Sequence, residues 1–352
     1  MLSTAAGPVV LGYYPSWTTD VTPDEIDYRP FTHLAHAFVT VGGDGTLVTD
    51  ERIPGRDLCE RAHRAKVKVL LAVGGADSNP TLTRAMSRPD AAARLVTPLV
   101  EMVARHGYDG IDVDWEFPAS EEDARRMNDF VRRVRAELDR RVPGALLTMA
   151  VPASDWNGRW FERDALLPHV DWVNVMTYDF HGPWSDHAGH NAPLYAVKND
   201  AKDGALLHFG AALTYWTRTK RWPREKLLLG VPAYGRGFAV SRWHETPTGT
   251  AAHPYLAYRD VAGLLAAGWA RRWDNEARVP FLEKPGGGEL ISYEDEASAA
   301  LKGAWIRRQR VRGLFFWEVT QDFLGGTHRL VRAARGAFLG ATGGPEGGAR
   351  RP

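Results

Sequence analysis

The sequence predicts a (β/α)8 barrel of the α/β class with a small α+β insertion between its seventh and eighth strands. Eight short apolar runs recur along the chain, helical patterns separate them, and 352 residues is a common size for one barrel unit. Most runs are continuous in Val, Ile and Leu, which is typical of parallel strands covered on both faces. An open doubly wound sheet is disfavoured, because the turn after the first run, GYYPSW, is not a glycine-rich phosphate loop.

The eight apolar runs are predicted to be the strands of the barrel. They are residues 9–14, 33–41, 68–74, 110–116, 146–152, 172–178, 226–234 and 313–319. A helix is expected over 121–140, capped by Ser120, with an apolar stripe of Met127, Phe130, Val131, Val134 and Leu138. Another is expected over 294–309, with the stripe Ala297, Ala300, Leu301, Ala304 and Trp305.

The order of the predicted elements indicates one domain. We expect a single barrel domain over residues 1–340 that includes the α+β insertion at 239–290, which is too long for one crossover helix. The stretch 341–352 is rich in Gly and is expected to be a disordered tail.

Composition excludes several classes of partner. Lys and Arg number 44 and Asp and Glu number 43, so neither a nucleic acid nor a membrane surface is expected as a partner, and no apolar run has transmembrane length. Cys59 is the single cysteine, which rules out an intrachain disulfide and a cysteine metal cluster. The first residues do not resemble a signal peptide. We expect a monomer that is cytoplasmic, or secreted if an export signal is missing from this sequence.

The stretch YDGIDVDWEFP (108–118) places four acids in an otherwise apolar run. Buried ionised carboxylates are unfavourable by several kcal/mol unless they are paired or have a function. Side chains of a strand alternate between its two faces, so one face carries Asp112, Asp114 and Glu116 and the other Ile111, Val113 and Trp115. We expect the acids to point into the barrel toward its carboxyl-terminal mouth, and Asp109, which is out of phase, to be structural.

Stacked carboxylates cannot all remain ionised, so they share protons and at least one pKa rises. A carboxyl with a raised pKa at the mouth of a barrel is suited to general acid catalysis. The alternative is a calcium site, which the Trp and Phe neighbours disfavour. His187 and His190 could form a metal-binding pair, but Gly189 and nearby prolines indicate a loop. We expect no metal and no cofactor.

The acidic motif DGIDVDWE resembles the DxxDxDxE signature of glycoside hydrolase family 18, the chitinases and their relatives. The resemblance covers about 10–323 and includes MTYDFHG (176–182), GHNAPLY, GVPAYGRGF (230–238), ISYEDEASAALKGAW and GLFFWEVTQDF. Three features depart from it. Ala72 replaces the serine of the S-x-G-G motif, Ala76 stands where many processive members have Trp, and the insertion is shorter. The last two disfavour a deep, processive groove.

The resemblance implies cleavage of β-1,4 linkages in chitin or N-acetylglucosamine oligomers, with retention, through an oxazolinium ion formed by the substrate's own acetamide. Glu116 would be the general acid, Asp114 would orient the acetamide, Asp112 would share the proton of Asp114, and Tyr178 would hydrogen-bond the acetamide carbonyl. The expected substrate-binding residues are Tyr13, Phe38, Trp115, Trp156, Met176, Asp179, Tyr234, Arg236 and Trp317. The plainer alternatives are core packing for Tyr13, Met176 and Tyr234 and solvent exposure for Arg236.

Two other functions remain open at this level. An endo-β-N-acetylglucosaminidase or a peptidoglycan-cortex hydrolase would use the same residues on another glycan. A chitin-binding lectin would use the same barrel without catalysis, but lectin-type members typically lose the acid that this chain has at Glu116.

Overall fold

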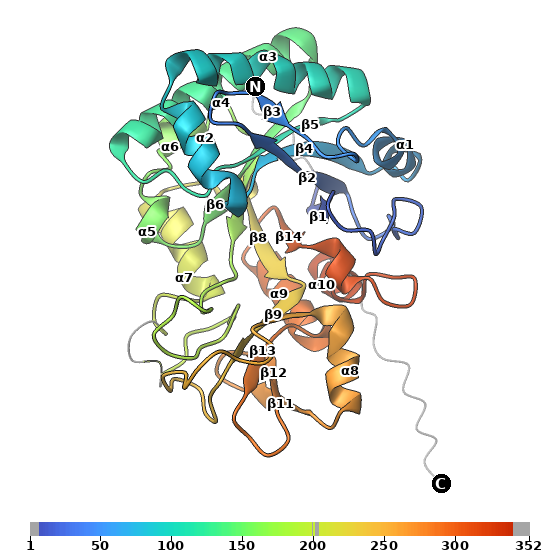
Figure 1. Cartoon of the computed structure of the whole chain (residues 1–352), viewed down its shortest axis with the longest axis vertical. Coiled ribbons are helices and arrows are strands. Elements are labelled where there is room, and N and C mark those ends of the chain that lie inside the picture. Colours follow the sequence, from blue (N-terminus) through green and yellow to red (C-terminus); the bar gives the residue numbers. More distant parts are fainter. Residues whose placement is uncertain (1–6, 199, 201–203, 341–352) are drawn as a thin grey trace.

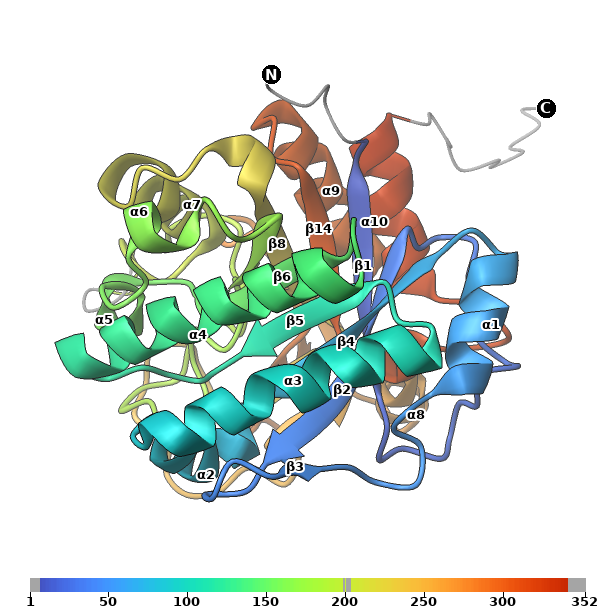
Figure 2. The same cartoon turned by 90° about the horizontal axis from the view of Figure 1, so that it is seen from above.

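The computed structural model describes residues 7–198, 200 and 204–340, so the expected tail at 341–352 lies outside the described residues. Its centre is a closed barrel (Figures 1 and 2) of eight parallel strands. They are β1 (Val9–Pro15), β2 (His33–Val41), β4 (Lys68–Gly74), β5 (Gly110–Asp114), β6 (Leu146–Pro152), β7 (Trp172–Met176), β8 (Leu227–Pro232) and β14 (Gly313–Trp317). Strand β1 pairs with both β14 and β2, which closes the barrel and confirms the predicted fold class.

Helices follow the barrel strands and cover their outer faces (Figure 2). They are α1 (Arg56–Arg64), α2 (Asn79–Met86), α3 (Pro89–His106), α4 (Glu121–Arg141), α5 (Asp155–Gly158), α6 (Arg163–Leu166), α7 (Phe209–Thr214), α9 (Glu296–Arg308) and α10 (Arg329–Leu339). A short strand, β3 (Leu47–Val48), pairs antiparallel with β2. The hydrophobic core thus lies between the barrel and its helices. The carboxyl ends of the strands are not covered by these helices and can form a site.

Helix α4 forms as the sequence predicts. Ser120 caps it, since the Ser120 hydroxyl accepts a hydrogen bond from the Asp123 amide at 3.1 Å. All five residues of its predicted apolar stripe are buried. The stripe therefore identifies the face that packs inward.

Helix α9 packs through a different face from the predicted one. Trp305 is buried as expected, but Ala297 and Leu301 are exposed, and Lys302 is buried in an ion pair with Glu294. A β-carbon at Gly303 would lie 2.1 Å from the carbonyl oxygen of Ala334 on α10, so the two helices approach closely along this line. The predicted stripe differs from the buried face because a charge partner buries Lys302 and the close approach of α10 buries Gly303.

The segment between β8 and β14 adds a second sheet, which lies below the barrel in the view of Figure 1. It is antiparallel, in the order β10-β9-β13-β12-β11. Its elements are β9 (Tyr234–Phe238), β10 (Tyr255–Ala257), α8 (Val261–Ala266), β11 (Ala270–Asp274), β12 (Val279–Glu283) and β13 (Leu290–Ser292). The sheet starts five residues before the expected limit of 239, because the seventh strand breaks at Ala233, whose amide bonds the Trp317 carbonyl at 2.7 Å.

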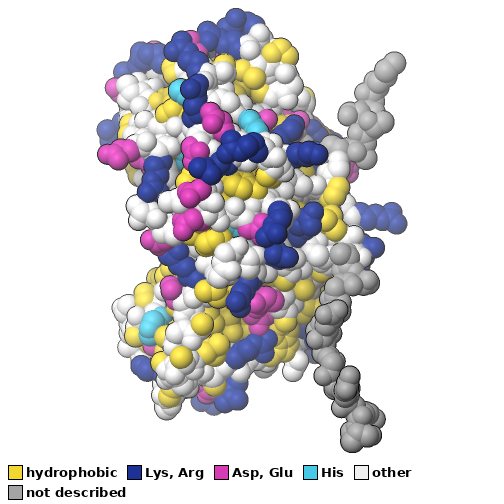
Figure 3. Space-filling model, turned by 90° about the vertical axis from the view of Figure 1, so that its right-hand side faces the viewer, with side chains coloured by type: hydrophobic (Ala, Val, Ile, Leu, Met, Phe, Trp, Pro, Cys, Tyr) yellow, Lys and Arg dark blue, Asp and Glu magenta, His cyan; other side chains and the backbone are white. Residues whose placement is uncertain are grey.

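Surface charge follows the balanced composition. On the face shown in Figure 3, Lys and Arg side chains are interspersed with Asp and Glu. Across the described residues, none of the helices combines the length and apolar character needed to cross a bilayer.

Candidate active site

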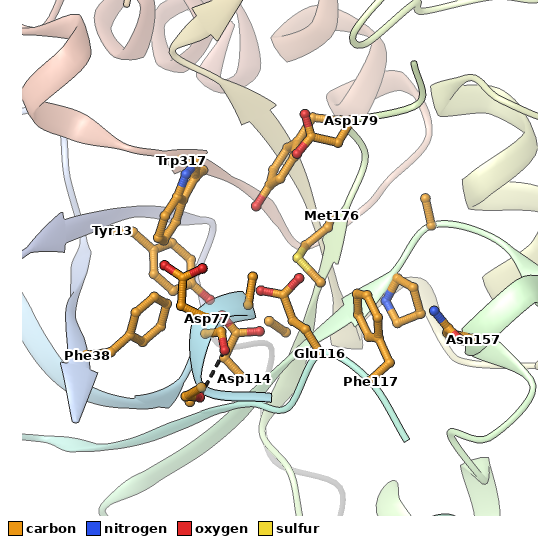
Figure 4. A pocket seen from close by; sticks show the side chains of 18 of the residues that line it. Tyr13, Phe38, Asp77, Asp114, Glu116, Phe117, Asn157, Met176, Asp179 and Trp317 are labelled. Atoms are coloured by element: carbon orange, nitrogen blue, oxygen red, sulfur yellow. Dashed lines mark hydrogen bonds between the residues drawn. The ribbon is translucent and has the colours of Figure 1, made fainter. Parts of the chain in front are cut away.

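A cleft of about 1310 Å³ opens at the carboxyl ends of the barrel strands (Figure 4). Most of the predicted site residues line it, from segments far apart in the chain. They are Tyr13, Phe38, Asp114, Glu116, Trp156, Met176, Tyr178, Asp179, Tyr234, Arg236 and Trp317. Asp112 lies beneath the cleft, fully buried, and Trp115 lies outside it. The fold therefore brings the predicted residues together with one clear exception.

Asp112 is the deepest acid of the row and is surrounded by neutral donors. Its carboxylate accepts hydrogen bonds from the Tyr13 hydroxyl at 2.7 Å, from the Asn174 amide at 3.0 Å and from the Thr148 hydroxyl. Burial raises the pKa of Asp112, and these three hydrogen bonds act in the opposite direction. Ala72 faces Asp112 in the register of β4 and β5 and supplies no side-chain donor, so Asp112 takes its donors from β1, β6 and β7.

Asp114 has no comparable set of donors. Burial raises the pKa of Asp114 well above its usual value, and the negative charges of Glu116 and Asp112 raise it further. Its Oδ1 atom is buried without a hydrogen-bond partner among the described residues. A buried acceptor of this kind needs a proton or a donor from a bound molecule, because leaving it unpaired is unfavourable by about 1–3 kcal/mol.

Glu116 lies just past the end of β5, in the middle of the cleft residues drawn in Figure 4. Burial raises the pKa of Glu116 to about 7, with further contributions from the negative charges of Asp179 and Asp77. The side chain therefore keeps its proton up to neutral pH and can donate it to a bound molecule. This matches the predicted raised carboxyl at the mouth of the barrel.

Asp179 and Arg236 form a bidentate ion pair above the acids. Arg236 donates from Nε to Oδ1 of Asp179 at 2.9 Å and from Nη2 to Oδ2 at 3.0 Å. The guanidinium also lies 5.1 Å from the ring centres of Trp184, Tyr234 and Tyr255. Arg236 is thus held in the cleft wall rather than free in solvent, which decides against its plainer alternative.

Tyr178 and Tyr234 are both buried residues with a cleft-facing side. Their rings pack edge to face at a centroid distance of 6.1 Å. Burial raises the pKa of the Tyr178 phenol well above its usual value, and the charges of Glu116 and Asp114 add to this, so the hydroxyl remains a hydrogen-bond donor. Gly230 makes room for the ring, since a β-carbon there would lie 2.6 Å from Cε1 of Tyr178.

Aromatic rings build the opposite wall of the cleft. Trp317 stacks on Phe38 at 5.6 Å, and Phe38 stacks in turn on Trp17 at 6.0 Å. Tyr13 packs against Trp317 at 5.5 Å. Trp17 is 56% exposed, so it extends the row from the barrel floor toward solvent. The wall is a set of flat apolar faces suited to sugar rings.

The cleft residues that sequence reasoning missed include Trp17, Asp77, Trp184 and Tyr255. Trp17 and Trp184 are more than half exposed, as is Trp156, which was predicted. Two of the missed residues could have been found from their positions after barrel strands, where barrel enzymes place their active sites. Trp17 lies two residues beyond β1, and Asp77 lies three residues beyond β4. Tyr255 belongs to the added sheet, and its stacking on Tyr234 at 4.8 Å could not be read from the sequence.

Trp115 is a wrong prediction as a substrate-binding residue. It is 2% exposed, and its indole N–H donates to the Asn79 and Thr83 side chains on α2, at 3.1 and 3.0 Å. The physical reason is strand alternation, which places Trp115 on the outer face with Ile111 and Val113. The expectation for Asp109 is confirmed, since its carboxylate accepts from the Val69 amide at 2.7 Å and is structural.

Within residues 7–198, 200 and 204–340, one group of three possible metal ligands has converging ligand atoms: His181, His187 and Asp200. Asp112, Asp114 and Glu116 do not form such a group, which disfavours the calcium alternative. His187 and His190 lie in a loop, as expected, and face different partners. His190 contacts Asp274 at 3.0 Å, whereas His187 contacts Asp200 at 3.2 Å.

The fold and the acid row define the class of protein, and comparison with known sequences agrees. The profile of glycosyl hydrolases family 18 matches residues 9–322. The chain therefore belongs to glycosyl hydrolases family 18, as the sequence motifs indicate.

Particular relatives are similar at modest identity. A probable endochitinase of Caenorhabditis elegans is 30% identical over 84% of this chain, and an oviduct-specific glycoprotein of Ovis aries is 27% identical over 88%. The chain spans 52% and 62% of the length of these two relatives. The Ostrinia furnacalis Group IV chitinase, solved in complex with allosamidin, superposes with a TM-score of 0.87 at 26% identity, over 95% of this chain and 99% of that one.

Proposed function

We propose that this chain is a retaining glycoside hydrolase that cleaves β-1,4 linkages of chitin or N-acetylglucosamine oligomers with help from the substrate's acetamide. The observation that carries the proposal is the unpaired, buried Oδ1 of Asp114 beside Glu116, whose pKa is raised to about 7. An acetamide N–H is a donor of the kind that this oxygen lacks. The family match, the C. elegans relative and the Ostrinia chitinase structure support the same substrate class.

Three carboxylates near Glu116 are poorly suited to act as a separate nucleophile. Asp179 is held by both nitrogens of the Arg236 guanidinium, and Asp112 is fully buried and accepts three hydrogen bonds. Asp114 is buried and its raised pKa disfavours a free carboxylate. Retention with a single acid therefore favours a nucleophile supplied by the substrate.

In the proposed reaction, Glu116 protonates the glycosidic oxygen and the bond from that oxygen to the anomeric carbon breaks. The acetamide carbonyl oxygen of the same sugar attacks the anomeric carbon, which forms a cyclic oxazolinium ion. The proton of Asp114 is shared with Asp112, so that Asp114 accepts the acetamide N–H and stabilises the positive charge, while the Tyr178 hydroxyl donates a hydrogen bond to the acetamide oxygen. The Glu116 carboxylate then takes a proton from a water molecule that opens the ring from the opposite face, and the original anomeric configuration returns.

The aromatic wall has a role in this scheme. Trp317, Phe38 and Trp17 present flat apolar faces to the sugar rings and exclude water from the acids. Exclusion of water strengthens the electrostatic interactions between the acids and the developing charge.

The test is incubation with chitin pentamer, cellulose pentamer, fully deacetylated chitosan, peptidoglycan and a high-mannose glycoprotein, followed by mass analysis and NMR of the products. We expect cleavage of the chitin pentamer with β-anomers at early times, and none of cellulose or chitosan. Prompt α-anomers, or equal cleavage of cellulose, would contradict the proposal. Products from peptidoglycan or glycoprotein alone would identify the alternative hydrolases, and binding of chitin without turnover would identify a lectin.

A further inference from the structure

Three histidines and one aspartate meet at the rim of the barrel, apart from the acid row. We call His181, His187, Asp200 and His244 the rim cluster. His181, His187 and Asp200 come from the connection between β7 and α7, and His244 comes from the connection between β9 and β10. The first three are at most 7% exposed, and the His244 side chain is 20% exposed. Buried imidazoles facing one carboxylate need a physical explanation.

One ligand atom from each of His181, His187 and Asp200 lies within 4.8 Å of the other two, and His244 lies next to the same carboxylate. Nε2 of His181 lies 3.5 Å from Oδ2 of Asp200, and Nε2 of His187 lies 3.2 Å from Oδ1. Nδ1 of His244 lies 4.0 Å from Oδ2 of the same carboxylate. Two ligands of a tetrahedral zinc ion, each about 2.0–2.1 Å from the metal, are about 3.3 Å apart. The separations of the three imidazoles from Asp200 are therefore close to the spacing that a zinc ion imposes on its ligands.

The Nδ1 atoms of His187 and His181 have hydrogen-bond partners outside the rim cluster. His187 Nδ1 lies 2.6 Å from Oδ1 of Asp186, and His181 Nδ1 lies 3.2 Å from the carbonyl oxygen of His190. Both partners are acceptors, so both Nδ1 atoms carry hydrogen. Each Nε2 atom faces the Asp200 carboxylate, to which it donates when it carries hydrogen; without that hydrogen it can ligate a metal ion. This is the arrangement by which proteins orient histidine ligands of a metal.

The backbone holds the ligands in place. The amide of Ala188 donates to the Glu245 carbonyl at 2.8 Å, and the amide of His244 donates to the Ala188 carbonyl at 2.9 Å. These two bonds tie the His187 loop to the His244 loop. Gly189 lies directly against His181, because a β-carbon there would be 2.4 Å from Cγ of that ring. Backbone contacts between the two loops thus fix the positions of the rings.

We propose that the rim cluster is a zinc site, with ligands from His181, His187, Asp200 and His244. Three imidazoles and one carboxylate favour zinc or another late transition metal over calcium or magnesium, which prefer oxygen ligands. The site is structural: it ties two rim loops together. Through Asp186, which bonds His187 and also lines the cleft, the ion stabilises one wall of the cleft.

The experiment uses the full chain without a histidine tag, stripped with a chelator and then titrated with zinc. We expect about one zinc per chain by elemental analysis, a lower Tm after stripping and its recovery with zinc. Cobalt in place of zinc should give the strong visible absorption of a tetrahedral ion. This spectrum needs no variant, so it does not depend on whether a variant folds.

Variants assign the binding to these residues. His187→Ala and His244→Ala should abolish stoichiometric zinc binding, whereas Asp186→Asn should weaken it by about 10–100-fold because it supports a ligand without being one. His63→Ala is the matched control. His63 pairs with Asp109, which directly precedes β5 and is not part of the rim cluster, so this variant should bind zinc as the wild type does. A stripped protein that binds no zinc, or a His187→Ala variant that binds it as well as the wild type, would overturn the proposal and identify the rim cluster as histidines paired with Asp200 alone.

Discussion

The acid row and the rim cluster both contain buried ionisable side chains, but these side chains have opposite electrostatic surroundings. The acid row, Asp112, Asp114 and Glu116, collects negative charge among Tyr, Thr and Asn donors, and the pKa values of all three acids are raised. The rim cluster surrounds a single carboxylate with imidazole nitrogens. One region is suited to keep a proton and the other to bind a cation.

This difference separates a reactive site from a structural one. A proton held on Glu116 by burial and by neighbouring charges can leave when a basic atom arrives, because its pKa lies near neutrality. A cation held by four side chains that are themselves held by backbone and carboxylate contacts has no such freedom. The comparison predicts that changes in the acid row alter rate and pH dependence, whereas changes in the rim cluster alter stability.

The largest expected effect comes from Glu116→Gln, which removes the acid proton and keeps the shape of the side chain. We expect kcat on chitin oligomers to fall by about 10²–10⁴-fold while binding survives, measured by steady-state kinetics and calorimetry. Stability gives an independent check. Wild-type Glu116 keeps a proton up to about pH 7, whereas its ordinary pKa is 4.5, so the folded wild type loses stability as pH rises through this window. The Gln variant should gain in Tm relative to wild type between pH 5 and 8. A loss of rate below 10-fold would contradict the general-acid role.

Trp317→Ala should lower the rate and the affinity for an oxazoline-like inhibitor, by about 10-fold or more, because it removes the inner face of the aromatic wall. The matched control is Trp115→Ala, which removes a Trp from the outer face of the barrel and should lower Tm with normal inhibitor affinity in the folded fraction. If Trp317→Ala behaves like its control, Trp317 belongs to the core and not to the binding wall.

Chelation should affect the rim cluster and leave the acid row unchanged. We expect the stripped protein to melt several degrees lower. The alkaline limb of its pH–rate profile should not move, because none of the groups that raise the pKa of Glu116 is a ligand of the proposed ion. A shift of that limb on stripping would show that the two regions are coupled electrostatically. A loss of all activity that only zinc restores would move the metal from structure to catalysis.

The smallest expected effect is that of Asp77→Asn, which removes one negative charge near Glu116. The pKa of Glu116 should fall, since the Asp77 charge raises it, and the alkaline limb of the pH–rate profile should move to lower pH by less than one unit. The variant keeps the size of the side chain, so Tm should be nearly unchanged. An unchanged profile would show that burial and the Asp179 charge set the pKa of Glu116 without a contribution from Asp77.

The sequence alone was enough for the barrel and for the row of acids, and the reason is periodicity. Continuous apolar runs specify buried parallel strands. A two-residue repeat places Asp112 and Asp114 on the inner face of β5 and continues to Glu116, just past its end. The same rule places Trp115 on the outer face, so that error came from setting the rule aside. Local capping was also readable, as Ser120 of α4 illustrates.

Tertiary structure decided everything that depends on residues distant in sequence. The donors to Asp112 come from three different strands, and the buried face of α9 depends on a partner for Lys302 and on the approach of α10. The rim cluster joins His181 to His244, 63 positions later, across two loops. No periodic signal marks such a contact, because loop geometry, and not the spacing of residues along a helix or strand, brings the side chains together.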